Sequence, residues 1–166
     1  MPRLIKAQGG RMVLANDSFT HVDDEQDLPG GDVILSLARF QTDGEALLSE
    51  GRAVGVRLSA DEEVEALAYD LPRIALVALT FPKFTDGRHY SSVRVLRERL
   101  GFTREVRAIG DVLREQAGPM LRCGFDAFEP ADGSAPEEWE RAAHRFRHVY
   151  QRGTDARTPA FVERGQ

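Results

Sequence analysis

Cysteine is almost absent from the sequence, which contains Cys123 alone. One cysteine excludes a disulfide within the chain, a CxxC redox pair and an iron–sulfur cluster held only by this chain's cysteines. Lysine is scarce as well, because Lys6 and Lys83 are the only lysines among 22 basic residues. Any redox chemistry would therefore need a bound organic cofactor or the metal centre of a partner.

Long apolar runs are also missing. No stretch approaches the roughly 18 apolar residues of a membrane span, and the first ten residues lack the apolar centre of a signal peptide. The formal net charge of −5 argues against general nucleic-acid binding, which needs a basic face. We therefore expect a cytoplasmic protein whose partners include neither a membrane nor a nucleic acid.

The common nucleotide-binding and hydrolase motifs GxGxxG, P-loop and GxSxG do not occur in the sequence. The cofactor, if there is one, stays unknown. Of the candidate metal ligands, His144 and His148 have the spacing of a zinc pair on a helix, but no third ligand is evident, so a solvated helix face is the favoured interpretation. For Cys123, a buried and inert thiol is favoured over a nucleophile.

What is present is the composition of one folded domain, with 166 residues of which 42% are hydrophobic. Residues 3–7 and 11–15 predict a β-hairpin around Gln8-Gly9-Gly10. An acidic stretch at residues 23–27 then leads into Pro29-Gly30-Gly31. We expect three parts: a hairpin with an acidic connector (1–31), an α/β domain (32–152) and a flexible tail (153–166).

From residue 32 onward, short apolar runs alternate with helical periods. The expected strands are 33–37, 53–58, 74–81, 105–109 and 125–128, and the expected helices are 40–50, 59–71, 91–100, 111–123 and 136–150. Ser59 and Glu62 form a capping box, and Gly118-Pro119 should break or kink its helix near the middle. The alternation predicts right-handed crossovers and a parallel sheet. Both a partial (β/α) barrel and an open doubly wound sheet fit, and we favour the half-barrel.

In either architecture ligands bind at the carboxyl ends of the strands. The densest polar segment there follows the most apolar strand, between Phe81 and Ser91, and the helix that starts next offers unpaired N–H groups to an anion. We expect Lys83 and Asp86 to act in acid/base chemistry. The expected anion-binding residues on this segment are Thr85, Arg88, Tyr90 and Ser91.

A second charged group follows the next strand along the chain. Arg107 and Asp111 could bind the same anion, since neighbouring parallel strands end at one edge of the sheet. Simpler interpretations remain: Asp111 can act only as a helix cap, and Asp86 can pair with Arg88 merely to hold a turn.

Several blocks of the sequence, taken in order, are similar to one known family. They are the residues 81–88 (FPKFTDGR), Tyr90-Ser91, residues 96–99, residues 107–114 and residues 122–129. Over residues 55–129 the chain resembles a bacterial family of unknown function whose members are described as oxidoreductases of sulfite reduction. The resemblance implies a role beside assimilatory sulfite reductase, because the genes of the family lie next to those of that enzyme. It carries over no catalytic residue.

Three functional hypotheses follow, in order of preference. The protein is an accessory of sulfite reduction that docks on the sulfite reductase hemoprotein, or a stand-alone enzyme for a small sulfur- or phosphate-containing anion. The third hypothesis is a structural subunit whose charged loop stabilises the fold or a homodimer.

Overall fold

The computed structural model describes residues 3–145 and 153, and their strands form one eight-stranded sheet. The strands are β1 (Leu4–Gln8), β2 (Arg11–Ala15), β3 (Phe19–His21), β4 (Asp32–Ser36), β5 (Val54–Leu58), β6 (Leu76–Phe81), β7 (Glu105–Gly110) and β8 (Ala127–Phe128). The helical elements are α1 (Leu37–Ser49), η1 (Val64–Leu67), α2 (Arg88–Arg94), η2 (Val95–Arg99), η3 (Arg114–Gln116), α3 (Ala117–Cys123) and α4 (Pro136–Ala143). Within the described part, no helix has the length and apolarity to cross a bilayer.

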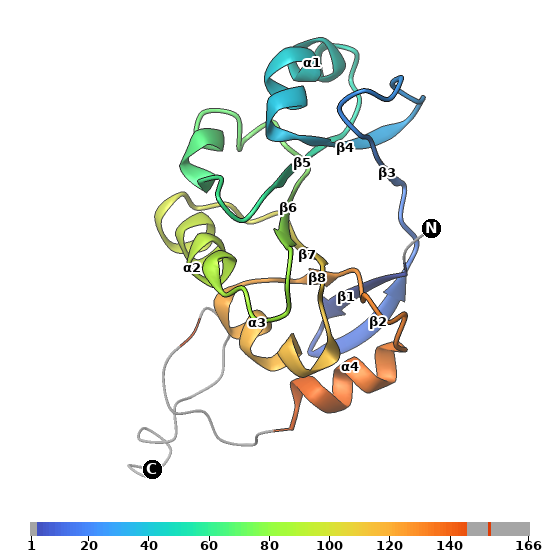
Figure 1. Ribbon diagram of the computed structural model, residues 1–166, viewed down its shortest axis with the longest axis vertical. Helices are drawn as coiled ribbons and strands as arrows, with labels where there is room; N and C mark the ends of the chain where they lie inside the picture. Colours follow the sequence, from blue (N-terminus) through green and yellow to red (C-terminus); the bar gives the residue numbers. More distant parts are fainter. Residues whose placement is uncertain (1–2, 146–152, 154–166) are drawn as a thin grey trace.

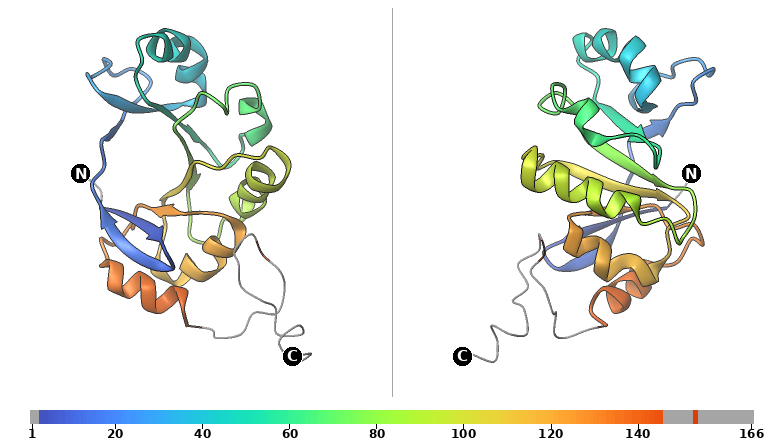
Figure 2. Two further views of the ribbon diagram at one scale, coloured as in Figure 1. Left: turned by 180° about the vertical axis from the view of Figure 1, so that it is seen from behind. Right: turned by 60° about the vertical axis from the view of Figure 1, so that its left-hand side comes forward.

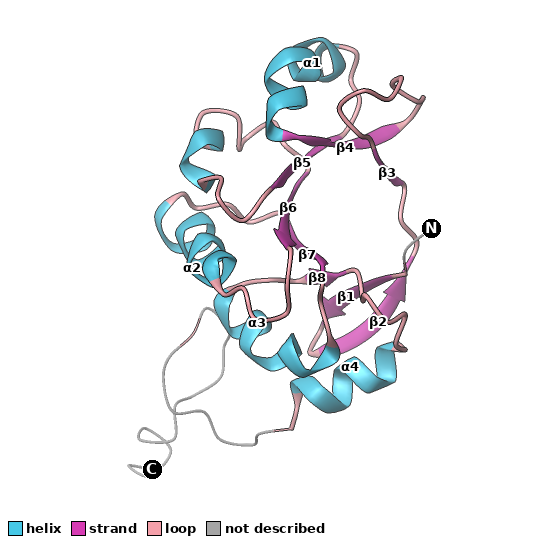
Figure 3. Ribbon diagram, in the orientation of Figure 1, coloured by secondary structure: helices cyan, strands magenta, loops and turns pink. Residues whose placement is uncertain are grey.

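The sheet curls into a half-barrel (Figure 1). Its strand order is β2-β1-β8-β7-β6-β5-β4-β3, in which β3 to β8 are all parallel and β1 runs antiparallel to both β8 and β2. Each parallel strand adds beside the previous one, so the order never reverses as it does in a doubly wound sheet. The helices consequently line the outside of the curve (Figures 2 and 3). The predicted half-barrel is confirmed.

The predicted N-terminal hairpin is confirmed too. Gly9 and Gly10 both have positive φ, at 58° and 79°, which is the backbone that a tight two-residue hairpin turn requires. β1 also pairs with β8, so the hairpin is part of the main sheet.

The connector at residues 16–31 contains a strand that the sequence pattern did not predict. Phe19–His21 pairs in parallel with β4. Three residues flanked by polar side chains give too short an apolar signal for a strand assignment. This strand forms the end of the sheet opposite the hairpin.

The crossover from β5 to β6 is less helical than expected. The predicted bond between Ser59 N and the Glu62 carboxylate is present at 2.8 Å, but only the 3₁₀ turn η1 follows. Val64 and Leu67 are buried, whereas Ala68 is exposed. The prediction of a helix to residue 71 was wrong. Val64, Leu67 and Leu71 of the predicted apolar face are all buried, but the chain reaches Leu71 through turns.

The crossover from β7 to β8 also differs. Asp111 caps no helix; α3 begins at Ala117, so Gly118 and Pro119 lie in its first turn, where proline is tolerated. The predicted mid-helix break is therefore wrong. α2 begins at Arg88, three residues early, and continues as the π-helix η2. The predicted end of the last helix and the tail beyond Gly153 lie outside the described residues.

The hydrophobic core lies between the sheet and its outer helices, and it includes Phe81, Phe128 and Trp139. The concave face carries a second, much smaller apolar cluster. Ile34, Leu76, Ala78 and Ile109 form it, with Phe19 packed against them. The same face also carries polar and charged side chains, among them Arg57, Thr80 and Arg107.

Candidate functional site

The polar segment predicted as a site is a surface loop at the carboxyl end of β6. Phe81 is buried at the end of the strand, residues 82–87 form the loop, and α2 starts at Arg88. Within the loop, Asp86 N donates to Lys83 O at 2.9 Å. The elements on either side are firmly packed, so the loop has fixed ends. We call residues 82–88 the β6–α2 loop.

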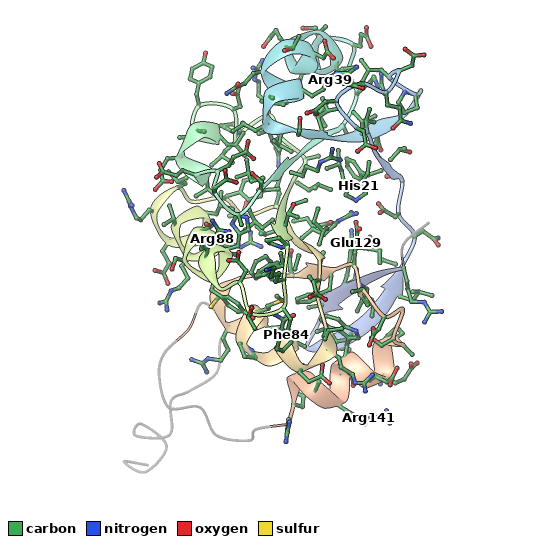
Figure 4. The ribbon with its side chains drawn as sticks, viewed as in Figure 1. His21, Arg39, Phe84, Arg88, Glu129 and Arg141 are labelled. Carbon is green, nitrogen blue, oxygen red and sulfur yellow. The ribbon has the colours of Figure 1, made fainter. Side chains whose placement is uncertain are left out.

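The middle of this loop is held from the neighbouring crossover. The Asp111 carboxylate accepts a hydrogen bond from Phe84 N at 2.8 Å, and the Gln116 amide donates to Phe84 O at 3.2 Å. Both backbone groups of Phe84 are thereby satisfied. The Phe84 side chain is 42% exposed, so the loop presents an aromatic ring to solvent on an immobilised backbone (Figure 4).

Gly110 makes this arrangement possible. Its φ is 92°, and a Cβ built there would lie 2.3 Å from the Phe81 carbonyl oxygen. The close approach allows Asp111 N to donate to the same carbonyl at 2.7 Å. That bond directs the Asp111 side chain towards Phe84. Asp111 is thus a brace for the loop.

Asp86 and Arg88 pair with each other within the loop. The Asp86 carboxylate accepts from Arg88 N at 3.1 Å and from Arg88 Nη2 at 2.7 Å. These hydrogen bonds and the arginine charge lower the pKa of Asp86 to about 2. A carboxylate so strongly stabilised as an anion is a weak base, so the pair suits a structural or binding role better than proton transfer.

Other side chains of the predicted site remain free. Lys83, Thr85 and Ser91 are exposed, and no hydrogen bond or ion pair reaches their side chains from any described residue. Tyr90 packs edge-on against Phe81, with ring centroids 5.7 Å apart, and burial raises the pKa of its hydroxyl. The loop and the start of α2 therefore bring six predicted residues into one unit, braced by Asp111.

Arg107 does not belong to this unit. It lies in the middle of β7 on the concave face, is 0% exposed, and is surrounded by carboxylates. Asp17 and Glu129 lie 2.7 Å from its Nη1, and Glu105 lies 2.8 Å from its Nε. Burial lowers the pKa of Arg107, but these carboxylates outweigh burial and raise it. The guanidinium of Arg107 donates four hydrogen bonds to these three carboxylates, so its charge is balanced within the protein.

A cavity of about 530 Å³ lies near the amino end of β8, away from the β6–α2 loop. It is lined by Arg97, Glu98, Leu121, Gly124, Phe125 and Gly153. Arg97 donates to the carbonyls of Phe102, Arg104 and Gly124 and so ties loops together at that end. No group of three His, Cys, Asp or Glu side chains suited to a metal ion occurs among residues 3–145.

A family model described as a bacterial protein of unknown function (DUF934) matches residues 55–161. The chain belongs to this family. No curated protein matches the sequence.

The DUF934 match covers the β6–α2 loop and its braces, and also three charged residues of the concave face: Arg57, Arg107 and Glu129. The segment that contacts these three lies outside the match, at residues 17–23. Sequence reasoning missed these contacts. The available signal was the alternation of Asp17, Phe19, His21 and Asp23, which is the period of a strand with one face inward.

Proposed function

We propose that the protein is an accessory of assimilatory sulfite reduction that docks on the sulfite reductase hemoprotein through its β6–α2 loop. The observation that carries the proposal is the exposed Phe84 ring on a backbone held at both its N–H and its C=O. The pathway comes from the resemblance of residues 55–129 to proteins of sulfite reduction. Membership of DUF934, a family of unknown function, is compatible with this role.

The chemistry of the loop favours binding over catalysis. In the sequence of the loop, Phe84 is flanked by Lys83, whose ammonium pairs with no described residue, and by Arg88, whose side chain is 58% exposed. Aromatic and arginine side chains supply most of the energy at protein interfaces. A loop that is already ordered also loses less conformational entropy on binding than a mobile one.

The residues available for redox chemistry also favour a partner protein that holds the redox cofactor. A single cysteine excludes a disulfide and a cysteine-ligated iron–sulfur cluster within this chain, and Asp86, with its pKa of about 2, is unsuited to proton transfer near neutral pH. The partner would then hold the redox cofactor, while this protein supplies a positively charged contact surface. A small stand-alone enzyme has less support from the same loop.

The binding test uses the purified protein and the purified hemoprotein in biolayer interferometry. Phe84→Ala should weaken binding by about tenfold or more, as expected of a central aromatic contact, and Lys83→Ala should weaken it less. Arg141→Ala is the matched control, because Arg141 is an exposed arginine on α4, away from the loop (Figure 4). Equal thermal midpoints of all variants establish that they are folded.

The pathway test is growth of a deletion strain. A deletion strain that grows on neither sulfate nor sulfite, but grows on sulfide or cysteine, would place the protein at the sulfite step. Normal growth on sulfate as sole sulfur source would overturn the pathway, and unchanged hemoprotein binding in Phe84→Ala would overturn the loop as the docking surface.

A further inference from the structure

Residues 17–23, which we call the N-terminal strap, cross the concave face of the half-barrel. Four alternate residues of the strap contact groups of this face. Asp17 pairs with Arg107, Phe19 packs on the concave apolar cluster, His21 lies 2.9 Å from Glu129, and Asp23 lies 3.2 Å from Arg57. Figure 4 shows His21 and Glu129 facing each other across the interior.

These contacts reach unusually far across the sheet. The backbone of the strap pairs with β4 alone, through β3 and the bond from Val22 N to Ile34 O. Its side chains nevertheless contact groups on β5, on β7 and just after β8. The strap therefore closes the open side of the half-barrel with side chains, where a full barrel would use strand pairing.

The links of the strap weaken along its length. Arg107 and Asp17 have side-chain exposures of 1% and 10%, whereas Arg57 and Asp23 have 22% and 87%. Exposed ion pairs contribute little, at about 0–1 kcal/mol. The Asp17 end is thus held by a buried ion pair. At the other end only the Asp23 side chain is loosely held, because Val22 is fully buried in the core and Asp23 O accepts hydrogen bonds from Gln26 N and Arg39 Nη1.

Beside the loosely held side chain of Asp23 lies a surface suited to an anion. Arg57, Ala78 and Arg107 occupy one row across β5, β6 and β7. Arg57 has Asp23 as its only partner among the described residues, and the hydroxyl of Thr80, one pleat further along β6, has none in that part of the chain. A guanidinium with free N–H groups matches the paired oxygens of a carboxylate or an oxyanion.

We propose that the Asp23 side chain covers an anion-binding site centred on Arg57. Asp23 occupies that site as an internal competitor. A carboxylate or oxyanion ligand displaces the Asp23 side chain, while the backbone of the strap stays paired with β4 and Asp17 stays paired with Arg107. The site is separate from the β6–α2 loop, so this inference does not depend on the docking proposal.

Ligand binding is tested by calorimetry with inorganic phosphate and with succinate, at constant ionic strength. Asp23→Asn should bind an anion about threefold to tenfold more tightly than the wild type, since an exposed competitor is removed. Asp27→Asn, an exposed acid of the same loop, is the matched control and should leave affinity unchanged. Tighter phosphate binding identifies an oxyanion site, and tighter succinate binding a carboxylate site. Retention of binding in Asp23→Asn/Arg57→Gln, or no binding of either anion to Asp23→Asn, would overturn the site.

Discussion

Replacement of Arg107 by methionine tests the most heavily charged part of the interior. The substitution keeps a long side chain but removes the only cation that contacts Asp17, Glu105 and Glu129 together. Removing one partner of a buried ion pair typically costs about 3–5 kcal/mol, because the remaining charges stay buried without compensation. Against a total stability of about 5–15 kcal/mol, this loss is severe.

The measurement is urea unfolding, followed by the fluorescence of Trp139. Trp139 is the only tryptophan, is fully buried and packs on Phe128 with ring centroids 4.9 Å apart. For a chain of this size, the expected loss corresponds to a fall in melting temperature of roughly 10 °C. Arg57→Met is the matched control. The partner that Arg57 has among the described residues, Asp23, is exposed, so the substitution should cost less than about 1 kcal/mol.

A second variant separates lost charge from lost packing. In Arg107→Met/Glu129→Gln/Asp17→Asn, two of the three carboxylates are neutral, so part of the lost stability should return. If the free energy of unfolding of Arg107→Met lies within about 1 kcal/mol of that of the wild type, the ion pairs of Arg107 with its three carboxylates do not stabilise the fold. Arg107 would then regain its predicted role in anion binding.

Three further predictions concern single positions. Gly110→Ala should lower the free energy of unfolding in urea by about 3 kcal/mol or more, because a left-handed backbone costs about 1–2 kcal/mol and the new Cβ would also meet the Phe81 carbonyl. The control Gly51→Ala has φ 78° and open space around the new Cβ, so it should show only the backbone cost. Equal losses in the two variants would contradict the close approach at Gly110. Burial lowers the pKa of His89, so the native state binds fewer protons than the unfolded state. The free energy of unfolding of the wild type should therefore fall as the pH drops below about 6.5. His89→Gln should reduce this dependence of stability on pH, and an unchanged dependence would show that another group causes it. The ratio of the hemoprotein affinities of the wild type and of Asp86→Asn should stay constant from about pH 4 to pH 7, because the pKa of Asp86 is about 2. A change of this ratio with pH in that range would refute the Asp86–Arg88 pairing.

Much of the architecture could be predicted from the sequence because its signals are local. The continuous apolar run that became β6, and the Gly9-Gly10 turn of the hairpin, depend on side-chain periodicity and backbone freedom of neighbouring residues. The β6–α2 loop could be located for the same reason, as the polar segment after a buried strand. Asp111 could be placed at the same edge of the sheet as this loop because parallel strands end at one edge, but the order of the strands could not be predicted.

Local signals misled where packing between distant segments decided the outcome. The period of residues 59–71 is helical, yet the chain buries Val64, Leu67 and Leu71 with one 3₁₀ turn followed by further turns. Asp111 follows a strand as a helix cap would, but its carboxylate instead holds Phe84, 27 residues away.

The sequence by itself determined the α/β class, the hairpin, the parallel crossovers and the position of the exposed loop. Tertiary structure alone decided that Arg107 is enclosed by carboxylates and that residues 17–23 close the half-barrel. The physical reason is distance along the chain: Asp17 lies 90 residues from Arg107 and His21 lies 108 from Glu129. No periodicity within one segment can encode which opposite charge the curled sheet will bring against it.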